Sequence, residues 1–418
     1  MRIAFVTPEF ITEGSSFDGG LSNYLARVSM GLRDAGHHAT IFVAANEPGF
    51  LDWQGTPVYR VKVKSSGFRS TLRKIMHLMG DCMSLLCLQA SHCLNEALRK
   101  SHGAKPFDIV QYSSYGATAY YRVRHIPAVV RLSSYQTLRR KMVGVSRPTR
   151  DDLRYERFER RAICKGDRIF GPSKLTIDAV QKDTERPVAF VPTPFVLETT
   201  QLDASIFQRF LQGRSYLLFF GSLWNLKGVG LIVEILPELL QRNPGLSFVF
   251  VGKDLGGGSG IKAMQQSYPD RILSFDRLPH SQLYPIIRES FAVVLPSLYD
   301  NCPNACIEAM AFGRIVIGSR NAGFEELIDH GNTGFLCRRG DSADLLRVLN
   351  EVLGLPRDIG MALGEAALKR VLELRPQRTI PKLISLYEDV LSSRRRGSAF
   401  TRSIPSQDTQ SAALWTSI

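Results

Sequence analysis

The sequence predicts an α/β protein made of two doubly wound parallel-sheet domains, and three observations lead to this fold class. The chain has 418 residues, which is more than one ordinary core accommodates and enough for two domains of roughly 150 to 200 residues each. Short apolar, β-branched runs alternate with helical patterns in both halves, as they do in βαβ units. Between the two series, VPTPFVLE at 191–198 contains proline turns typical of a linker.

The first domain is predicted to span residues 1–193. It opens with the buried strand RIAFVTP, which is followed by the glycine-containing loop FDGGLSNY and by a helix that ends near Arg33. The same alternation predicts the later strands. They are HATIFVAA at 38–45, FDIVQY at 107–112, AVVRLSS at 128–134 and RIFGPS at 168–173.

A linker over 194–214 leads to the second predicted domain, 215–375. Its strands are YLLFFGS at 216–222, LSFVFVG at 246–252, FAVVLPS at 291–297 and IVIGS at 315–319. Ligands of such sheets bind beyond the carboxyl ends of the strands, so two domains in tandem predict a ligand cleft between them. An amphipathic helix over 376–396, expected to pack back toward the first domain, and a Ser/Thr/Gln-rich disordered tail over 397–418 complete the chain.

The composition indicates which classes of partner and which cellular compartment to expect. The net charge of +14 favours an anionic partner, namely nucleotide phosphates, an acidic lipid surface or nucleic acid. The 7 cysteines are odd in number and lack CxxC spacing, which argues for a reducing compartment and against a disulfide framework or a zinc site. The N-terminal apolar run is too short for a signal peptide, and no uncharged apolar run reaches the ~18 residues of a membrane span. These features predict a cytoplasmic protein.

Two segments combine basic and apolar residues. Between Phe68 and Lys100, apolar residues recur at helical spacing, which fits either a helix packed in the core or one lying on a membrane surface. The densest basic run, at 137–161, fits either a solvated, partly salt-bridged helix face or a surface for an anionic acceptor or lipid. The apolar stripe of the first segment is Leu72, Ile75, Met76, Met79, Met83, Leu86, Ala90 and Leu94.

The stretch SLYDNCPNACIEAMAFGR at 297–314 carries the main functional signal. An apolar strand ends just before it and a helix pattern stopped by Gly313 follows, so its turn lies at the amino end of a helix, where N–H groups and the helix dipole favour an anion. Asp300 or Asn301 fits a helix cap equally well. Glu308 lies among apolar residues inside the helix and needs donors such as the hydroxyls of a ribose.

The run PSLYDNCPNACIEAMAFGRIVIGS, with NAGFEELI and GNTGFL after it, resembles the donor-binding signature of the retaining GT-B glycosyltransferases of glycosyltransferase family 4. This large family includes sucrose synthases, glycogen synthases and bacterial mannosyltransferases. The resemblance covers the second domain well and the first more loosely. It implies the GT-B fold, in which two Rossmann-like domains face a cleft, and transfer of a sugar from a nucleotide diphosphate sugar with retention at the anomeric carbon.

The resemblance assigns roles to the two acids of this run. Glu308 falls on the second acid of the family motif, which binds the ribose hydroxyls of the nucleotide. Asp300 falls on the first acid, which reaches hydroxyls of the transferred sugar and is usually a glutamate. The turn residues that fall where the family's turn approaches the sugar and the phosphates are Asn301, Cys302, Pro303, Asn304 and Ala305.

A second family mark is a Gly-Arg-Leu run that ends in Lys-Gly, whose Arg and Lys hold the diphosphate. This chain has GSLWNLKG, in which Gly221 and Lys227 match and Ser222 stands at the position of the arginine. Lys227 is expected to neutralise charge on the leaving diphosphate, so the implied catalytic residues are Lys227, Asp300 and Glu308. The loop FDRLPHSQL resembles the family's base-binding loop, with backbone groups near Leu278 meeting the nucleobase.

The first domain carries weaker marks of the family. Gly19 and Gly20 resemble the glycine loop that lets the backbone approach the donor, although a tight turn explains the pair equally well. Many members have a histidine on the loop after the strand equivalent to AVVRLSS, where this chain has Ser133 and Ser134. The nearest histidine, His125, precedes that strand.

The leading hypothesis from the sequence is a retaining hexosyltransferase of polysaccharide or glycoconjugate biosynthesis, with a UDP- or GDP-sugar as donor and a glycan or lipid-linked acceptor. No Asp-x-Asp triplet occurs, so we expect neither an essential metal nor any other cofactor. The basic segments favour an acceptor at the cytoplasmic face of an anionic membrane. The alternative is a non-catalytic nucleotide-sugar or membrane-surface binding protein, and nucleic acid is not expected because no recognition motif is present.

Overall fold

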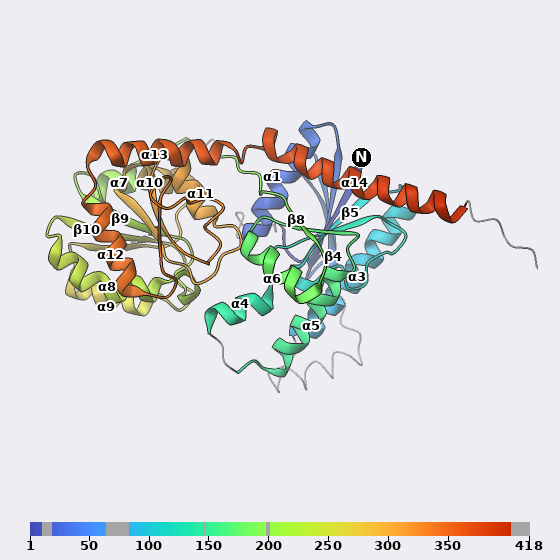
Figure 1. Cartoon of the computed structure of the whole chain (residues 1–418), viewed down its shortest axis with the longest axis horizontal. Coiled ribbons are helices and arrows are strands. Elements are labelled where there is room, and N and C mark those ends of the chain that lie inside the picture. Colours follow the sequence, from blue (N-terminus) through green and yellow to red (C-terminus); the bar gives the residue numbers. More distant parts are fainter. Residues whose placement is uncertain (11–18, 64–82, 145–146, 198–200, 403–418) are drawn as a thin grey trace, which may run out of the picture.

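The computed structural model describes residues 1–10, 19–63, 83–144, 147–197 and 201–402. Two α/β units lie side by side, the first drawn in blue to green and the second in yellow to orange, and one long helix at the end of the chain crosses from the second to the first (Figure 1). Both units contain a mostly parallel sheet. The predicted fold class is confirmed.

The first sheet has the strand order β3-β4-β2-β1-β5-β6-β7-β8 within the described residues. Its strands run parallel except for β3, which pairs antiparallel with β4. The bounds are β1 Arg2–Thr7, β2 His38–Ala45, β3 Gly49–Trp53, β4 Thr56–Lys62, β5 Ile109–Ser113, β6 Ala128–Arg131, β7 Arg168–Gly171 and β8 Val188–Phe190.

Helices cover both faces of this sheet, which explains why its strands read as continuous apolar runs. Successive side chains of β1 point to opposite faces. Ile3 and Phe5 pack in a cluster with the first and last helices of the chain, whereas Ala4 and Val6 pack with Leu94 of α3. The helices of this unit are α1 Gly20–Asp34, α3 Met83–Ala104, the short η1 Tyr115–Ala117, α4 Gln136–Val143, α5 Arg150–Cys164 and α6 Lys174–Thr184.

The predicted apolar stripe between Phe68 and Lys100 is described only from Met83 onward, and its first four residues lie outside the described ranges. In the described part, Leu94 and Leu98 are fully buried in the first core, whereas Met83 is exposed. The core-packing interpretation therefore holds for the second half of α3.

The second sheet has the order β11-β10-β9-β12-β13-β14, and all of its pairs are parallel. Its strands are β9 Ser215–Phe220, β10 Leu246–Val251, β11 Ile272–Phe275, β12 Ala292–Leu295, β13 Ile315–Ser319 and β14 Phe335–Cys337. Its helices are α7 Ser205–Phe210, η2 Asn225–Lys227, α8 Val229–Arg242, α9 Gly258–Ser267, α10 His280–Glu289, α11 Asn304–Ala311, α12 Ser342–Leu353 and α13 Arg357–Leu372. The stretch predicted as linker contains α7, which packs against α10.

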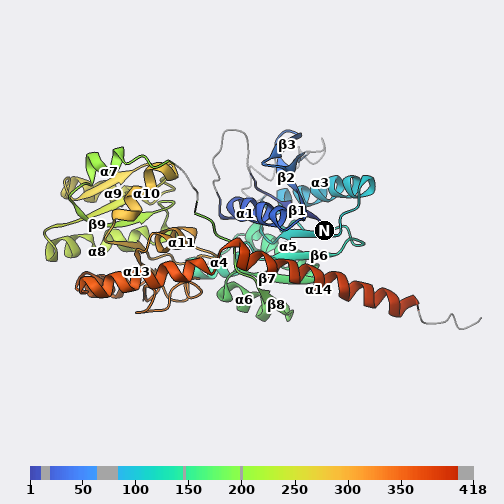
Figure 2. The ribbon, with the colours of Figure 1, turned by 90° about the horizontal axis from the view of Figure 1, so that it is seen from above.

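The last helix, α14 Pro376–Arg402, returns to the first unit. Figure 2 shows α13 along the second unit and α14 continuing along the first. The side chains of Ile380, Leu383 and Tyr387 are buried in the first core, and the Tyr387 hydroxyl donates to Gln111 Oε1 at 2.6 Å. The helix continues through 397–402, where the sequence predicted a disordered tail; this span contains no proline, and a single glycine costs only about 1 kcal/mol of helix stability. Residues 403–418 lie outside the described ranges.

Candidate functional site

The first turns of α1 and α11 meet at the boundary between the two units. A side chain at Gly20, the first residue of α1, would lie 3.5 Å from Nδ2 of Asn304, the first residue of α11. Arg27, two turns further along α1, donates to Asn304 Oδ1 at 3.4 Å. Two helix amino ends and a guanidinium thus converge, and such an arrangement attracts an anion.

Lys227 and Asp300, predicted as site residues, are neighbours in space. The ammonium of Lys227 donates to Asp300 Oδ2 and forms an ion pair with it, and both side chains are partly buried. Two glycines make this approach possible. A side chain at Gly228 would lie 2.0 Å from the carbonyl oxygen of Pro296, and one at Gly323 would lie 2.1 Å from that of Asp300, so neither position has room for a Cβ atom.

The contacts of the Asp300 side chain show that it does not cap α11. The N-cap of α11 is Pro303, and none of the side chains that the structure describes caps that end of the helix. Instead, Asp300 Oδ1 accepts from the N–H of Asn301 at 3.0 Å, and Oδ2 faces Lys227. Asp300 is therefore a charged group of the cleft rather than a cap, and the first-turn N–H groups of α11 are without intrahelical acceptors.

Glu308 is buried on the second turn of α11, with 6% of its surface exposed. Residues four positions apart share one face of a helix, so Glu308 lies on the face of Asn304, the side nearest to α1. Ala305 is partly buried in the same helix.

Asn301 ties the two units together. Its side-chain amide donates to the carbonyl oxygens of Leu132 at 2.9 Å and Ser133 at 3.0 Å, just beyond β6. Cys302 follows at the same boundary, and burial raises the pKa of its thiol. Their side chains line a small cavity of about 130 Å³ with Pro303 and the 190–193 segment.

The other predicted donor contacts lie at the carboxyl ends of neighbouring strands. Gly221 follows β9 and donates its N–H to Val251 at the end of β10, with Ser222 next to it. Leu278 lies after β11, where it packs on the second core. In the first unit, Gly19 is the N-cap of α1. Parallel sheets bind ligands at this edge. Of the predicted residues, the structure brings Gly20 next to Asn304 and Lys227 next to Asp300.

In the first unit, polar side chains gather at the carboxyl ends of β5 and β6. The hydroxyls of Ser113 and Ser133 lie 3.0 Å apart, and Ser133 stands where many family members have a histidine. Arg131 is buried with its guanidinium 3.6 Å from the centre of the Tyr24 ring, and it donates to Thr193 Oγ1 at 3.0 Å. Burial lowers the pKa of Arg131.

Four residues on segments that follow the strands of the first unit were not predicted from the sequence. They are Glu9 after β1, Arg27 on α1, Tyr115 on η1 and Arg139 on α4. Arg27 could have been predicted from the sequence, because it lies seven residues after Gly20 and so on the same face of the helix. No local pattern in the sequence links the others.

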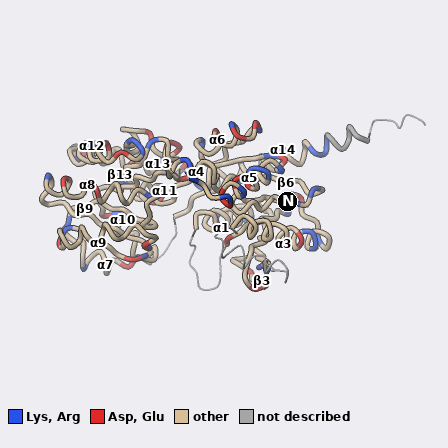
Figure 3. The backbone as a smooth tube through the Cα atoms, turned by 90° about the horizontal axis from the view of Figure 1, so that it is seen from below, with Lys and Arg blue, Asp and Glu red and all other residues tan. Residues whose placement is uncertain are grey.

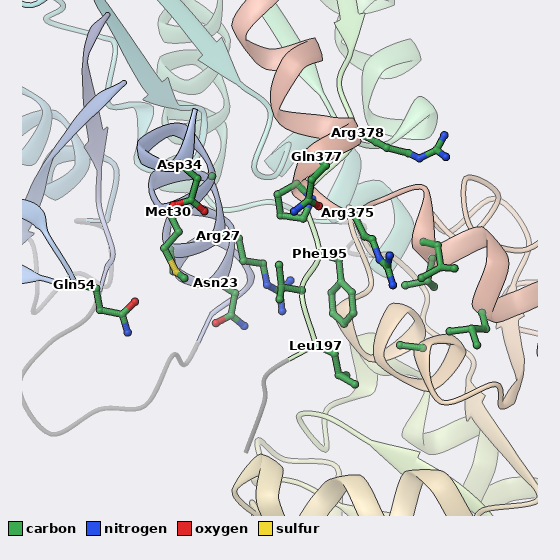
Figure 4. A pocket seen from close by; sticks show the side chains of 18 of the residues that line it. Asn23, Arg27, Met30, Asp34, Gln54, Phe195, Leu197, Arg375, Gln377 and Arg378 are labelled. Carbon is green, nitrogen blue, oxygen red and sulfur yellow. The ribbon is translucent and has the colours of Figure 1, made fainter. Parts of the chain in front are cut away.

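A larger cavity, of about 1100 Å³, opens where the chain crosses between the units. Figure 4 shows Asn23, Arg27 and Met30 of α1 on one side and Phe195 and Arg375 on the other. The Arg27 guanidinium lies 4.6 Å from the centre of the Phe195 ring. Both covalent connections between the units line this cavity, so it marks the hinge side of the molecule.

The basic run at 137–161 forms α4 and α5, where acidic segments lie among the basic ones (Figure 3). Arg140 and Glu156 form an ion pair at 2.5 Å, so part of this run is a salt-bridged face, as one interpretation predicted. Within the described ranges, no three His, Cys, Asp or Glu side chains gather to hold a metal ion. No helix in those ranges combines the length and apolar character needed to cross a bilayer.

Comparison with known proteins covers both units. Residues 19–194 match the model of the glycosyl transferase 4-like domain, and residues 214–354 match that of glycosyl transferases group 1. The D-inositol 3-phosphate glycosyltransferase of Corynebacterium jeikeium is 28% identical over 187 residues, 43% of this chain and 44% of that protein. The glycogen synthase of Mycobacterium tuberculosis is 30% identical over 148 residues, 34% and 35% of the two chains. The matched part therefore spans less than half of these curated relatives.

Solved structures resemble most of the chain. The sucrose-phosphate synthase of Thermosynechococcus elongatus covers 94% of this chain and 99% of its own, with a TM-score of 0.73 at 17% identity. The Anabaena protein HepE, solved with UDP and glucose, covers 93% of this chain and 100% of its own, with a TM-score of 0.66 at 16% identity. The two family models follow one another along the two units, so the protein belongs to the GT-B glycosyltransferases of family 4.

Proposed function

We propose that the protein transfers a hexosyl group from a UDP- or GDP-sugar to a hydroxyl of a glycan or glycolipid acceptor, with retention at the anomeric carbon. The main support for this proposal is that the amino ends of α1 and α11 converge beside Lys227. A leaving diphosphate is stabilised by positive charge that is already in place.

Each residue of the cleft has a task in this reaction. Glu308 accepts from the ribose hydroxyls, and Asp300 accepts from hydroxyls of the transferred sugar, since ionised carboxylates are strong acceptors. The bond between the anomeric carbon and the diphosphate breaks with its electron pair on the diphosphate, where Lys227 offsets the charge. The acceptor oxygen then bonds on the same face, and its proton passes to the leaving phosphate.

Arg27 supports the diphosphate in place of the arginine that Ser222 replaces. It reaches the first turn of α11 from the opposite unit. Its positive charge is therefore next to the diphosphate only when the two units are together. We propose that no metal ion is essential, because Lys227, Arg27 and the two helix ends supply the counter-charge. The names of relatives agree with this donor chemistry: HepE was solved with UDP and glucose, and starch synthase IV of Arabidopsis thaliana with ADP and acarbose.

The test combines binding and turnover. Calorimetric titration with UDP and GDP identifies the nucleotide, and labelled sugars of that nucleotide are then incubated with glycan and lipid extracts, with and without a chelator. Glu308→Gln is expected to weaken nucleotide binding by tenfold or more, because a hydrogen bond to a charged group contributes about 1.5 to 3 kcal/mol. Glu365→Gln, an exposed change on α13, is the matched control.

The outcomes separate the candidates. Failure of both nucleotides to bind, or unchanged binding by Glu308→Gln, would show that the proposal is wrong. Rates that collapse with chelator and return with magnesium would contradict only the metal-independent part. Nucleotide binding without transfer or hydrolysis would favour the non-catalytic binding protein, which the serines at 133 and 222 motivate.

A further inference from the structure

Helix α6 of the first unit begins at the boundary with the second unit (Figure 1). Its N-cap residue, Ser173, has the extended backbone of an N-cap but makes no side-chain capping bond. The Ser173 hydroxyl is fully buried and has no hydrogen-bond partner among the described residues. An N-cap serine usually accepts from an N–H of the first helical turn, so Ser173 lacks the bond that its position offers.

A residue of the second unit caps α6 instead. Glu326, in the turn that follows β13, accepts through Oε1 from the N–H of Lys174, the first residue of α6. A carboxylate suits this place, because the first N–H groups of a helix have no intrahelical acceptor and the helix dipole favours a negative charge there. The first turn of α6 is therefore capped across the boundary between the two units.

The turn that carries Glu326 is held by its own unit and covers the Ser173 hydroxyl. The carbonyl oxygen of Glu326 accepts from Nε and Nη2 of Arg370 on α13, at 3.1 and 2.6 Å. A side chain at Gly323 would lie 3.7 Å from Ser173 Oγ and 2.1 Å from the carbonyl oxygen of Asp300. The capping turn thus lies between the start of α6 and the segment that carries Asp300.

The segment that carries Asp300 also contacts α6. Tyr299 is buried in the core of the first unit, and its hydroxyl lies 3.5 Å from Oγ1 of Thr176, in the first turn of α6. The N–H of Asp300 donates to the carbonyl oxygen of Ala322, just before the capping turn, at 2.8 Å. Two segments of the second unit are therefore joined to each other, and both hold the first turn of α6.

We propose that Glu326 is a positioning residue, which holds the two units closed by alternating with Ser173 as the cap of α6. In the closed arrangement, which is that of the structure, Glu326 caps the helix and the Ser173 hydroxyl is left without a partner. When the units part, Glu326 returns to water and Ser173 accepts from its own helix. Because one cap takes the place of the other, the two arrangements stay close enough in free energy for a ligand to shift their populations. The importance of closure rests on the proposed function, in which both units contact the donor.

The alternation of caps predicts that one loss compensates for another. Glu326→Ala removes the cap of the closed arrangement, whereas Ser173→Ala removes the cap of the open one, so the double variant should return toward the wild-type balance. Deuterium exchange of the amides of 299–301, measured on the full chain without ligand, reports the open fraction even when it is small. We expect exchange to be about fivefold faster in Glu326→Ala, no faster in Ser173→Ala, and slower in the double variant than in Glu326→Ala.

Three further variants serve as a graded test and as controls. Glu326→Gln keeps an oxygen that can accept from Lys174 but carries no charge, so we expect a smaller effect than in Glu326→Ala. Asp178→Ala removes a carboxylate from an exposed position of the same helix. Ser247→Ala removes the hydroxyl of a buried serine in β10. Neither control should alter the exchange of 299–301.

The effect on the donor is measured next, as the dissociation constant of UDP or GDP. A smaller closed fraction lowers the apparent affinity in proportion, so we expect the affinity to fall in Glu326→Ala and to recover in the double variant. An affinity that is the same in the wild type and in Glu326→Ala would contradict the coupling of this contact to the donor.

The exchange measurements decide the inference by themselves. Faster exchange in the double variant than in Glu326→Ala would overturn the alternation of caps, because two independent structural losses add. Equal exchange in the wild type and in Glu326→Ala would show that Glu326 does not hold the units closed. No donor is needed for these results, so a wild type that binds neither nucleotide would contradict the proposed function and leave the test of Glu326 intact.

Discussion

At the scale of single residues, the buried carboxyl of Glu159 holds the start of α4. The side chain is fully buried, and Oε2 accepts from the N–H of Gln136, the first residue of α4, at 2.8 Å. Oε1 is buried without a hydrogen-bond partner in the described structure. Burial raises the pKa of Glu159 from 4.5 to about 8, so the group is mostly protonated at neutral pH.

The raised pKa of Glu159 makes the protein less stable as pH rises. Between pH 4.5 and about 8 the folded protein keeps a proton on Glu159 that the unfolded chain has lost, so the free energy of unfolding falls as pH rises through that window, by up to about 1.4 kcal/mol per pH unit. Glu159→Gln still offers Gln136 an oxygen and does not titrate. We expect urea unfolding of this variant to show a flatter decline and greater stability than the wild type at pH 8; parallel curves would contradict this.

Local sequence and the family resemblance were enough to single out part of the candidate site. Asp300 and Glu308 lie in one helix-turn segment, and Lys227 follows a strand, so each could be found from local sequence. Glu9 follows β1, Tyr115 follows β5 and Arg139 lies on α4, so no local pattern in the sequence links them. The side-chain link from Asn301 to the carbonyls after β6 was equally hidden, because neither partner carries a sequence signal for the other.

At the scale of elements, α1 and α14 pack through a glycine. A side chain at Gly31 of α1 would lie 2.7 Å from Cγ1 of Ile380, closer than two carbon atoms can approach. Sequence periodicity predicted α14 and the buried strands but not the β3–β4 hairpin. Its turn, Gln54-Gly55, has positive φ at both residues, the geometry of a tight hairpin, and Gln is a weaker turn signal there than Asn or Asp.

The α1–α14 contact predicts a coupled pair of substitutions. Gly31→Ala improves helix propensity by about 1 kcal/mol, but overpacking against Ile380 costs about 1 to 3 kcal/mol, so we expect net destabilisation. Ile380→Ala removes the clashing atoms and leaves a cavity. The double variant should be more stable than the sum of the single changes predicts, as measured by a double-mutant cycle in urea; strict additivity would show that the two helices do not meet there.

At the scale of the whole molecule, the two units are joined by covalent connections and by side-chain contacts. The hinge-side cavity is lined by both covalent connections, and Asn301 of the second unit binds the carbonyls of Leu132 and Ser133 in the first. Tyr299 of the second unit is also buried in the core of the first. Rotation about the hinge must break these contacts, so the parts of the candidate site that the two units supply separate when the units part.

Asn301→Ala is expected to favour separation of the units. It removes both donated hydrogen bonds but also the buried Oδ1, which has no partner among the described residues, so the loss of overall stability should be modest, about 1 kcal/mol. Hydrogen exchange should speed up at the amides of Ser133 and Ser134 and remain unchanged in β9 and β10. The exposed Asn332→Ala is the control, and equal exchange in both variants would argue against the proposed role of Asn301.

Because α14 packs on the first unit, the core of that unit can be completed only at the end of translation. The buried face of α1 is complete only when Ile380, Leu383 and Tyr387 cover it, and these residues are synthesised after the whole second unit. On the ribosome the second unit can close its core while the first still exposes an apolar stripe. A split gene that encodes residues 1–193 alone should therefore yield an aggregating product, and supplying the α14 segment as a separate peptide should rescue it.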